Sequence, residues 1–363
     1  MSSASTVLVY EFFSGGGSPE GELPAGLASE ALGMLWAVLQ DFRNWGAVHT
    51  ITAIDPRFER LLPGSGRETL PADEVVSARA GEHEDVYLSL LKRCDAVLAI
   101  APETDGVLSK LAEQAETEGL PLLGSNSSAI ATAGNKATCS RLFDLANIPA
   151  PVTRTASFLT AAHVAGQLQW PLIVKPVDGV GCEGVCCLNN LSELPSILAL
   201  IRRTTSQEQI LLQSLASGIP ASVSLLVAES GCMPLSLNLQ LIDAGAPYQY
   251  LGSRVPLHHP MGDRAMELAA LAAGLIPGLK GYIGVDVVLA EDRVELIEIN
   301  PRITTSYLAL RQVAGVNLAR AMWEACMLDI LPDRFALNGD AVIRKDDPGS
   351  WGLQPGSDGM RTT

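Results

Sequence analysis

The stretch 294–303, with the sequence VELIEINPRI, constrains the fold of this chain more than any other. Apolar and polar residues alternate along its first positions, which is typical of a β-strand with one buried face. Glu298 and Asn300 are therefore expected on the same face, about 7 Å apart along the strand. Ile297 and Ile299 are expected to point into the core.

Pro301 ends this strand because it has no N–H to donate, and Arg302 follows it. A carboxylate, an amide oxygen and a guanidinium thus gather at one strand end. Oxygen ligands suit Mg²⁺, and an adjacent arginine suits phosphate. An edge strand with a solvated polar face explains the pattern equally well, so the rest of the chain has to decide.

A second strand, expected over 281–290, carries the carboxylate of Asp286 among valines. An unpaired carboxylate there would be costly to bury, so Asp286 needs a cation nearby. The short connection 291–293 predicts an antiparallel hairpin with the first strand. Asp286 lies opposite Glu298 only if the turn has an odd number of residues or a β-bulge corrects the register. Otherwise Ile297 would face Asp286, and the metal site would be lost.

Composition narrows the class of protein. The chain has 363 residues, of which 47% are hydrophobic and 18% charged, so we expect a globular protein of two or three lobes. A net charge of −15 argues against duplex nucleic acid as a partner. The N-terminus lacks the basic region of a signal peptide, and the apolar stretches are too short to span a membrane. We therefore expect a cytoplasmic protein, and a homodimer remains open.

The seven cysteines form no CxxC pair, which favours reduced thiols. Cys182, Cys186 and Cys187 are clustered, but no fourth ligand follows at the spacing of a zinc site.

The first 120 residues alternate predicted strands with predicted helices, which indicates a parallel α/β sheet. Ligands bind such sheets beyond the carboxyl ends of the strands. The glycines 15–17 lie at one of these ends and could present backbone N–H groups to an anion, or could simply form a tight turn. They do not match GxGxxG, so a dinucleotide site is disfavoured.

Two lysines and a glycine-rich segment favour a nucleotide site. Lys136 lies in the first turn of a predicted helix, where the dipole disfavours a cation but favours bound anions. Lys175 follows the apolar residues 172–174 and needs an anionic partner. The segment 178–184, DGVGCEG, could close its backbone over phosphates through Gly179, Gly181 and Gly184. A solvated lysine and a plain hairpin are the alternatives.

Gln213 lies near the end of a predicted strand over 209–214 and could accept a hydrogen bond from an adenine amino group. The polar face of a strand is an equally good explanation. From Asp333 onward, Gly, Pro and Asp dominate, so a loosely packed or disordered tail is expected.

Taken in order, Lys136, the IVKP strand with its glycine-rich loop, Gln213, Asp286 and EINPR resemble the ATP-grasp superfamily over roughly 120–328. The resemblance implies an α/β protein, α+β in its ATP-binding lobes, with an ATP-grasp fold and an N-terminal parallel-sheet pre-grasp domain. The implied domains are a pre-grasp substrate domain at 1–120, a small lobe at 121–205, a C-terminal lobe with the Mg²⁺ site at 206–330, and the tail at 331–363.

The resemblance also implies roles for the residues that bind ATP. Lys136 and Lys175 would contact the phosphates, with Lys175 also near adenine, and 179–184 would be the flexible loop that covers the phosphates. Gln213 and the Leu215 backbone would hold adenine. Members of the superfamily often place an acidic ribose ligand after this point, but 218–224 contains no carboxylate, which leaves Ser222 or Ser224.

The remaining implied roles concern the metal and the substrates. Asp286, Glu298 and Asn300 would bind Mg²⁺, with Mn²⁺ as an alternative. Arg302 would contact the transferring phosphoryl group or the substrate carboxylate, which makes Arg302 and Lys175 the candidate catalytic residues. Expected substrate contacts come from strand ends and loops: Glu11, Ser14, Gly15, Gly16, Glu103, Thr104, Arg254, Thr304 and Thr305.

The implied activity is amide formation. A carboxylate attacks the γ-phosphate of ATP to give an acyl phosphate and ADP, and an amine then displaces phosphate. YEFFSGGG at 10–17, DAVLAIAPET at 95–104 and EINPR followed by two threonines are similar to the tyramine–L-glutamate ligase group of methanofuran-type cofactor biosynthesis. Another amino-acid or dipeptide ligase, a regulatory ATP-binding protein without turnover and an NAD-dependent oxidoreductase are the alternatives.

Overall fold

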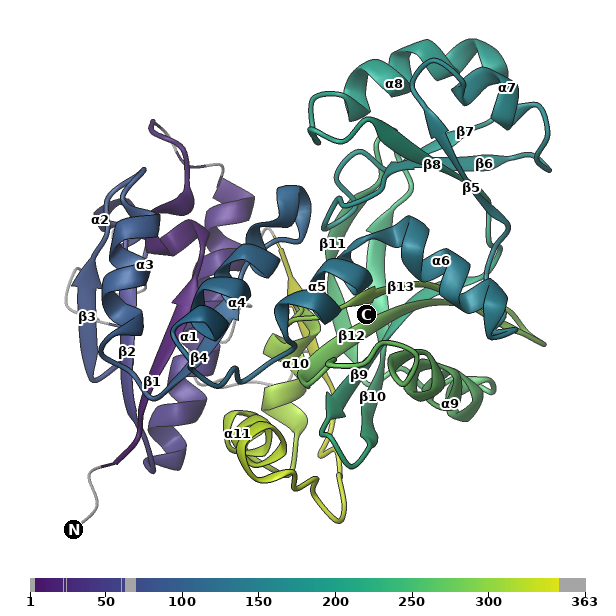
Figure 1. Cartoon of the computed structure of the whole chain (residues 1–363). Coiled ribbons are helices and arrows are strands. Elements are labelled where there is room, and N and C mark those ends of the chain that lie inside the picture. The colour runs from purple at the N-terminus through teal and green to yellow at the C-terminus, as the bar shows by residue number, and fades with distance from the viewer. Residues whose placement is uncertain (1–3, 22, 24, 60, 63–69, 346–363) are drawn as a thin grey trace.

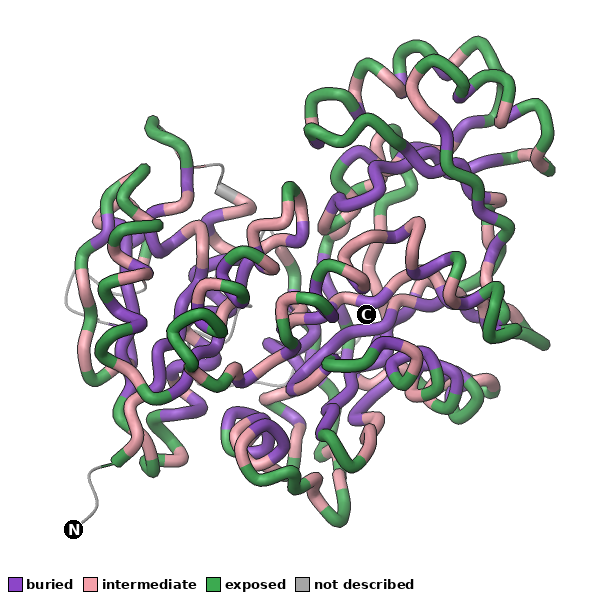
Figure 2. Tube along the Cα trace, viewed as in Figure 1, coloured by how far each residue is buried: buried purple, intermediate pink, exposed green. Residues whose placement is uncertain are grey.

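A computed structural model describes residues 4–21, 23, 25–59, 61–62 and 70–345 of the chain. Three β-sheets organise these residues into three lobes (Figure 1). In Figure 2, buried residues follow the strands of the sheets, while the outer faces of the helices are exposed. Among the described helices, none is both long enough and apolar enough to cross a membrane.

The N-terminal lobe contains a parallel four-stranded sheet, as the sequence predicted. Its strands are β1 (Thr6–Glu11), β2 (His49–Ile54), β3 (Glu74–Ser77) and β4 (Ala96–Ile100), in the order β3-β2-β1-β4. Its helical segments are α1 (Ala25–Trp45), α2 (Pro56–Glu59), α3 (His83–Leu91) and α4 (Val107–Thr117), with the short turns η1 (Phe13–Gly17) and η2 (Thr104–Gly106).

Strand β1 is buried on both faces, as expected of a central strand in a parallel sheet. Val7 and Val9 belong to the core that includes α1, while Leu8 and Tyr10 belong to the core that includes α3 and α4. Glu11 is the last residue of this strand. It therefore lies at the carboxyl edge of the sheet, where parallel sheets bind ligands.

The small lobe has an antiparallel sheet in the order β5-β8-β6-β7. Its elements are β5 (Thr153–Ser157), α7 (Ala161–Ala165), β6 (Leu172–Pro176), β7 (Cys186–Leu188), η3 (Leu191–Glu193), α8 (Leu194–Ile201) and β8 (Gln209–Ser214). Leu172 and Val174 pack into the core that this sheet forms with α7 and α8. Because successive side chains of a strand point to opposite faces, Ile173 and Lys175 face the centre of the molecule.

The C-terminal lobe has a six-stranded antiparallel sheet in the order β13-β12-β9-β10-β11-β14. Its strands are β9 (Ile219–Val227), β10 (Cys232–Asp243), β11 (Gln249–Val255), β12 (Gly281–Leu289), β13 (Val294–Asn300) and β14 (Ala341–Arg344). The helices around it are α5 (Ser127–Gly134), α6 (Lys136–Leu145), α9 (Gly262–Ala273), α10 (Ser306–Val313) and α11 (Leu318–Leu328).

The two faces of this large sheet pack against different helices. Val223 and Leu225 belong to the core shared with α5, α6 and α9. Leu226 and Tyr282, on the opposite face, belong to the core shared with α1, α10 and α11. Ser222 lies on the same face as Leu226 by the strand period, beyond the part that these helices cover, and there the face forms the floor of a cavity.

The hairpin of β12 and β13 has the register that the metal site requires. Leu289 pairs with Val294, so four residues connect the strands, and that even number alone would misplace Glu298. A β-bulge between Asp286 and Val287 corrects the register, and Asp286 pairs with Glu298. The predicted alternative, an even connection corrected by a bulge, is confirmed.

Two expectations for this lobe are corrected. Ile297 is the residue displaced by the bulge, and it lines the cavity instead of pointing into the core. The expected loosely packed tail does not hold for Ala341–Arg344, which form β14 and pair with β11 at the edge of the sheet. Strand β11 was itself not predicted. Residues 346–363 of the expected tail lie outside the described residues.

Candidate active site

A cavity of about 920 Å³ lies where the three lobes meet. Its floor is the open face of the six-stranded sheet, the strand β6 of the small lobe lines one side, and β1 and α1 line another. Many residues predicted for separate roles line this one cavity: Glu11, Lys136, Lys175, Gly179, Gly181, Gln213, Leu215, Ser222, Asp286, Glu298, Asn300, Arg302, Thr304 and Thr305.

Glu298 is the anionic partner that both lysines require. Its Oε2 lies 3.4 Å from the Nζ of Lys136 and 3.7 Å from the Nζ of Lys175. Burial would raise the pKa of Glu298, but the two ammonium groups outweigh it and hold the pKa below its usual range. Burial and Lys136 together lower the pKa of Lys175 despite the attraction of Glu298. One carboxylate thus serves two buried cations, which remain available to a second anion.

Asp286 lies beside Glu298 across the hairpin, but its pKa is raised where that of Glu298 is lowered. Burial, and after it the charge of Glu298, raise the pKa of Asp286 to about 7. The hydrogen bond from Gln240, with 3.0 Å between Nε2 and Oδ1, and a hydrogen bond from Asn300 oppose this shift only in part. A carboxylate so poorly stabilised as an anion would gain from a bound cation.

These side chains fit Mg²⁺ in the chemistry of their donor atoms. Asp286, Glu298 and Asn300 offer two carboxylates and an amide oxygen from neighbouring strands. Mg²⁺ in nucleotide sites is usually held by one or two carboxylates together with phosphate oxygens and water. Among the described residues there is no cluster of three His, Cys, Asp or Glu side chains that could hold a metal by itself. Asp286, Glu298 and Asn300 therefore suit a metal ion whose remaining ligands are phosphate oxygens of a nucleotide and water.

Arg302 is held in place by Glu103, from the loop after β4. The guanidinium Nε lies 3.0 Å from Oε1 and 3.1 Å from Oε2 of Glu103. Burial disfavours the charged guanidinium, but Glu103 outweighs burial and raises the pKa of Arg302. Arg302 lines the cavity, whereas Glu103, predicted to contact the substrate, lies behind it and orients it. Arg302, which the sequence showed only as an arginine at a strand end, is thus a cation held in a fixed position by Glu103.

The glycine-rich segment between β6 and β7 covers the lysine side of the cavity. The Lys136 ammonium donates to the Gly179 carbonyl, with 2.7 Å between the atoms. Gly181 has φ +59, a conformation that glycine tolerates best. Gly184 does not line the cavity, because it packs against Pro176 and Thr204. Asp178 anchors the segment, accepting from the Thr205 hydroxyl at 2.8 Å and from the Asp105 N–H at 2.9 Å.

The residues predicted to hold adenine and ribose line the same cavity, with partners of their own. The Gln213 amide donates to the Thr153 hydroxyl at 2.9 Å, which leaves its oxygen as an acceptor. The Leu215 N–H donates to the Pro171 carbonyl at 3.1 Å, so its carbonyl is the group that a ligand could use. Ser222 lies within hydrogen-bond distance of Ser306 and Asn238.

Several residues predicted to contact substrate do not line the cavity. Gly15 packs against the Tyr10 ring, and Gly16 has φ +95 beside the Arg79 carbonyl, which favours the tight-turn interpretation of the glycine triplet. Ser14 donates its N–H to Glu11 in the same turn. The exposed Arg254 pairs with Asp340 at 3.1 Å, away from the cavity. The Thr104 hydroxyl donates to the Asp178 carbonyl at 3.1 Å and so helps to hold the glycine-rich segment.

Five further residues that line the cavity were not predicted from the sequence: Glu30, Gln240, Tyr248, Tyr250 and Lys345. For Gln240 a sequence signal exists, because a strand period of two puts it on the same face as Ser236 and Asn238. Glu30 lies inside a helix, and Lys345 lies in the expected tail. No local signal placed either of them near the site.

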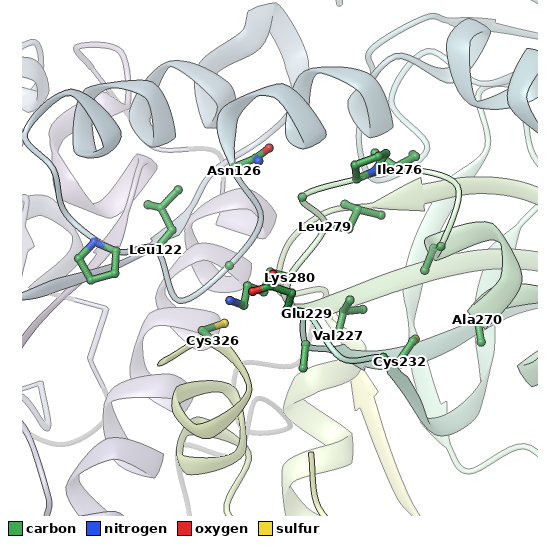
Figure 3. Close-up of a pocket in the computed structure, with 18 of the residues that line it drawn as sticks. Leu122, Asn126, Val227, Glu229, Cys232, Ala270, Ile276, Leu279, Lys280 and Cys326 are labelled. Atoms are coloured by element: carbon green, nitrogen blue, oxygen red, sulfur yellow. The ribbon is translucent and has the colours of Figure 1, made fainter. Parts of the chain in front are cut away.

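A second cavity, of about 750 Å³, lies between the loop before α5, the turn between β9 and β10 and the end of α9 (Figure 3). Its labelled residues include the apolar Leu122, Val227 and Ile276, with Lys280 and Glu229 near the middle of the view. No residue predicted for phosphate, metal or substrate lines this cavity. The cavity between the three lobes is therefore the candidate active site.

Known proteins with similar sequences identify the family of the chain. The ATP-grasp domain family matches residues 133–306, and the pre ATP-grasp 3 domain family matches residues 48–130. Tyramine–L-glutamate ligase of Methanocaldococcus jannaschii is 33% identical over 278 residues, which cover 73% of this chain and 76% of that protein.

Solved structures show the same fold. An ATP-grasp superfamily protein from Archaeoglobus fulgidus has a TM-score of 0.67 and 25% sequence identity, with 94% of this chain and 92% of that chain covered. An L-amino acid ligase from Bacillus licheniformis has a TM-score of 0.66 and 15% identity, with 90% of this chain and 75% of that chain covered, which bears on the fold alone.

The fold and the matched families define the class: the chain belongs to the ATP-grasp family, whose members use ATP. Within that family it is an ATP-dependent ligase that joins a carboxylate to an amine.

Proposed function

We propose that the chain binds ATP with Mg²⁺ in the cavity between its lobes and joins the carboxylate of an amino acid, with L-glutamate as the first candidate, to an amine. The observation that carries the proposal is the convergence of Lys136, Lys175, Asp286, Glu298 and Arg302 on one cavity. The relative from Methanocaldococcus jannaschii, named for tyramine and L-glutamate, supplies the candidate pair. The proposed working parts are the pre-grasp domain at 1–120 and the two ATP-binding lobes expected at 121–205 and 206–330. The boundary between these two lobes is better placed after β8 than at 205, because β8 pairs with β5 and β6 of the small lobe.

The charges of the site suit phosphoryl transfer. Lys136, Lys175 and Arg302 supply three cations, and Glu298, Asp286 and Glu103 supply as many carboxylates close to them. Mg²⁺ held by Asp286, Glu298 and Asn300 would add the positive charge that a transferring phosphoryl group needs. The protein then contributes positioning and charge neutralisation, with no nucleophilic side chain.

In the proposed first step, a substrate carboxylate oxygen attacks the γ-phosphorus, the bond to the β–γ bridging oxygen breaks, and ADP leaves. Arg302, fixed by Glu103, contacts the transferring group or the substrate carboxylate. In the second step, the amine nitrogen attacks the acyl carbon and phosphate leaves. Gln213 and the Leu215 carbonyl hold adenine in this proposal, and Ser222 lies near the ribose.

The test is ADP release by the purified chain with Mg²⁺, ATP, one amino acid and one amine. We expect L-glutamate with tyramine, or another pair from a panel of amino acids and amines, to accelerate ADP release at least tenfold over ATP alone, with a stoichiometric amide. An amino-acid or dipeptide ligase with other substrates would respond to a different pair. A chain that binds ATP and releases no ADP with any pair would contradict the proposal.

Asp178 offers a second prediction, on ATP binding. Replacing it by alanine removes the hydrogen bonds that hold the glycine-rich segment to Thr205 and Asp105. Hydrogen bonds to a charged group are worth about 1.5–3 kcal/mol, so a less ordered segment should raise the KM for ATP by about tenfold or more. Steady-state ADP release at varied ATP measures this effect. Asp292→Ala, on the exposed turn between β12 and β13, is the control, and equal KM values for the two variants would refute the anchoring role.

A further inference from the structure

The cavity extends beyond the lysines and the metal residues toward the N-terminal lobe. There it is bounded by apolar side chains from the ends of β1 and β4 and from α1, namely Phe13, Leu27, Ala31, Met34 and Pro102. None of these side chains can neutralise a phosphate or hold a metal. This end of the cavity therefore suits the uncharged body of a substrate.

Two carboxylates stand among these apolar walls. Glu11, the last residue of β1, is only 1% exposed, and Glu30 projects from α1. The Glu11 carboxylate accepts from the backbone N–H groups of Ser14 at 2.7 Å and Phe13 at 3.3 Å. Those neutral donors orient the carboxylate without cancelling its charge. Buried anions of this kind favour a cationic ligand.

Glu30 is more firmly held. Its Oε1 accepts from the Thr305 hydroxyl at 2.6 Å, and its Oε2 lies 3.0 Å from the Lys345 ammonium. Its charge also acts on Arg302 and on the partly buried Tyr250. Glu30 thus lies close enough to both Glu11 and Arg302 for its charge to act on each of them.

The pKa of Glu11 lies above the usual range of a carboxyl group. Burial raises the pKa of Glu11 to about 7, the hydrogen bonds from Ser14 and Phe13 oppose the shift, and the charge of Glu30 adds to it. The other titratable groups around this end are Tyr10 beside Glu11, Tyr250 on β11, Lys345 paired with Glu30, and Arg302 paired with Glu103. A base is most useful when its pKa lies near the working pH.

We propose that Glu11 and Glu30 bind the ammonium of the amine substrate, and that the Glu11 carboxylate takes its proton before the amine attacks. The amine carries an apolar body that lies along Phe13, Leu27 and Met34. This inference rests on the proposed function, because it assigns the amine end of the same cavity. The acidic pair also excludes the substrate carboxylate from this end and directs it toward Arg302.

The step balances without a further reactant. The ammonium gives one proton to Glu11, which becomes a neutral carboxyl, and the freed nitrogen pair forms the bond to the acyl carbon. The bond between that carbon and the phosphate oxygen breaks with its electron pair. The nitrogen loses its surplus proton to the departing phosphate or to water, and Glu11 returns its own proton to solvent.

Hydroxylamine separates this step from activation of the acid, because it is largely unprotonated at neutral pH and needs no base to become a nucleophile. The experiment compares two reactions of wild type, Glu11→Gln and Glu11→Asp at saturating ATP. One is amide formation from the pair found by ADP release, and the other is hydroxamate formation from the same acid with hydroxylamine. We expect Glu11→Gln to lower kcat/KM for the amine by about 10²-fold and to keep hydroxamate formation within about threefold. Glu11→Asp should recover part of the loss.

The pH dependence of kcat/KM for the amine distinguishes a chemical role of Glu11 from a structural one, because a structural role would leave this dependence unchanged. Glu11 is protonated below its pKa of about 7 and ionised above it, so wild-type kcat/KM for the amine should rise as pH passes through 7. The pKa of Asp286 is also raised to about 7, but Asp286 acts in hydroxamate formation as well, so the effect of Glu11 is measured as the ratio of kcat/KM for the amine to kcat/KM for hydroxylamine. Glu11→Gln should remove the rise of this ratio near pH 7. Glu30→Gln removes the charge that raises the pKa of Glu11, so its inflection should move to lower pH.

The outcomes are distinguishable. Wild type that forms neither amide nor hydroxamate would overturn the proposed function itself. A Glu11→Gln variant with wild-type amide formation and an unchanged pH profile would overturn only the role of Glu11. Equal losses with the amine and with hydroxylamine would show that Glu11 supports the fold instead, and would also overturn it. Glu229→Gln, an exposed carboxylate beside the second cavity, is the control and should match wild type throughout.

Discussion

Replacing Glu298 by glutamine is expected to lower ATP-dependent turnover by about 10²–10³-fold, the usual cost of losing one preorganised electrostatic contact. Glutamine keeps the size of the side chain but removes the charge that Lys136 and Lys175 share. It also removes one of the two carboxylates that face each other across the bulged hairpin. Both consequences weaken the placement of Mg²⁺ and of the phosphates, so kcat should fall together with the affinity for the metal.

Steady-state ADP release at saturating ATP and varied Mg²⁺ measures this effect. Glu295→Gln is the matched control, because Glu295 lies on the same strand and pairs with Arg293 at 3.5 Å outside the cavity. Unchanged ADP release by Glu298→Gln, with every substrate pair that wild type accepts, would remove Glu298 from the site. A thermal melt separates lost chemistry from lost folding, since Glu298→Gln leaves two buried lysines with less compensation.

The residues that carry local patterns were predictable from the sequence. Asp286 among valines indicated a burial cost that only a cation could offset. Glu298 on its alternating strand was equally compatible with a solvated polar face until Asp286 and the two lysines were considered with it. The sequence did not decide between a connection of odd length and a β-bulge. The number of residues in the connection depends on the last pair formed by the two strands, and the sequence does not show that pair. In the structure pairing continues to Leu289 and Val294, and the displaced residue is Ile297, which therefore joins the cavity.

What the sequence could not place depends on contacts between distant segments. Glu30 lies in the middle of a helix, and only its contacts with Thr305 and Lys345 bring it to the site. Strand β14 forms in an expected tail because β11 offers it an edge. Glu103, at a strand end, was predicted to contact the substrate. In the structure it instead holds Arg302, which lies 199 residues further along the chain. The residue pattern within one segment does not indicate which distant segment it will contact.

Replacing Asp41 by alanine is expected to lower the free energy of unfolding by about 3–5 kcal/mol, the range found when one partner of a buried ion pair is removed. Asp41 lies on α1 and is 6% exposed. Its carboxylate accepts from Arg311 through Nε at 3.0 Å and Nη2 at 2.6 Å, and from the Tyr307 hydroxyl at 2.7 Å. Its backbone carbonyl accepts from Asn317 at 2.7 Å. Asp41 thus joins the N-terminal lobe to α10 and to the start of α11.

Urea unfolding followed by circular dichroism measures the loss, with Glu324→Ala as the control. Glu324 pairs with Arg320 at 2.7 Å on the surface of α11, where such a pair is worth about 0–1 kcal/mol. The contrast follows from burial: alanine at position 41 leaves the Arg311 guanidinium, with 12% of its side chain exposed, without its carboxylate. Adding Arg311→Met to Asp41→Ala removes that stranded charge and should recover part of the stability. Similar losses for Asp41→Ala and Glu324→Ala would mean that water solvates Arg311 and that the two lobes are joined mainly by apolar contacts between α1 and α11.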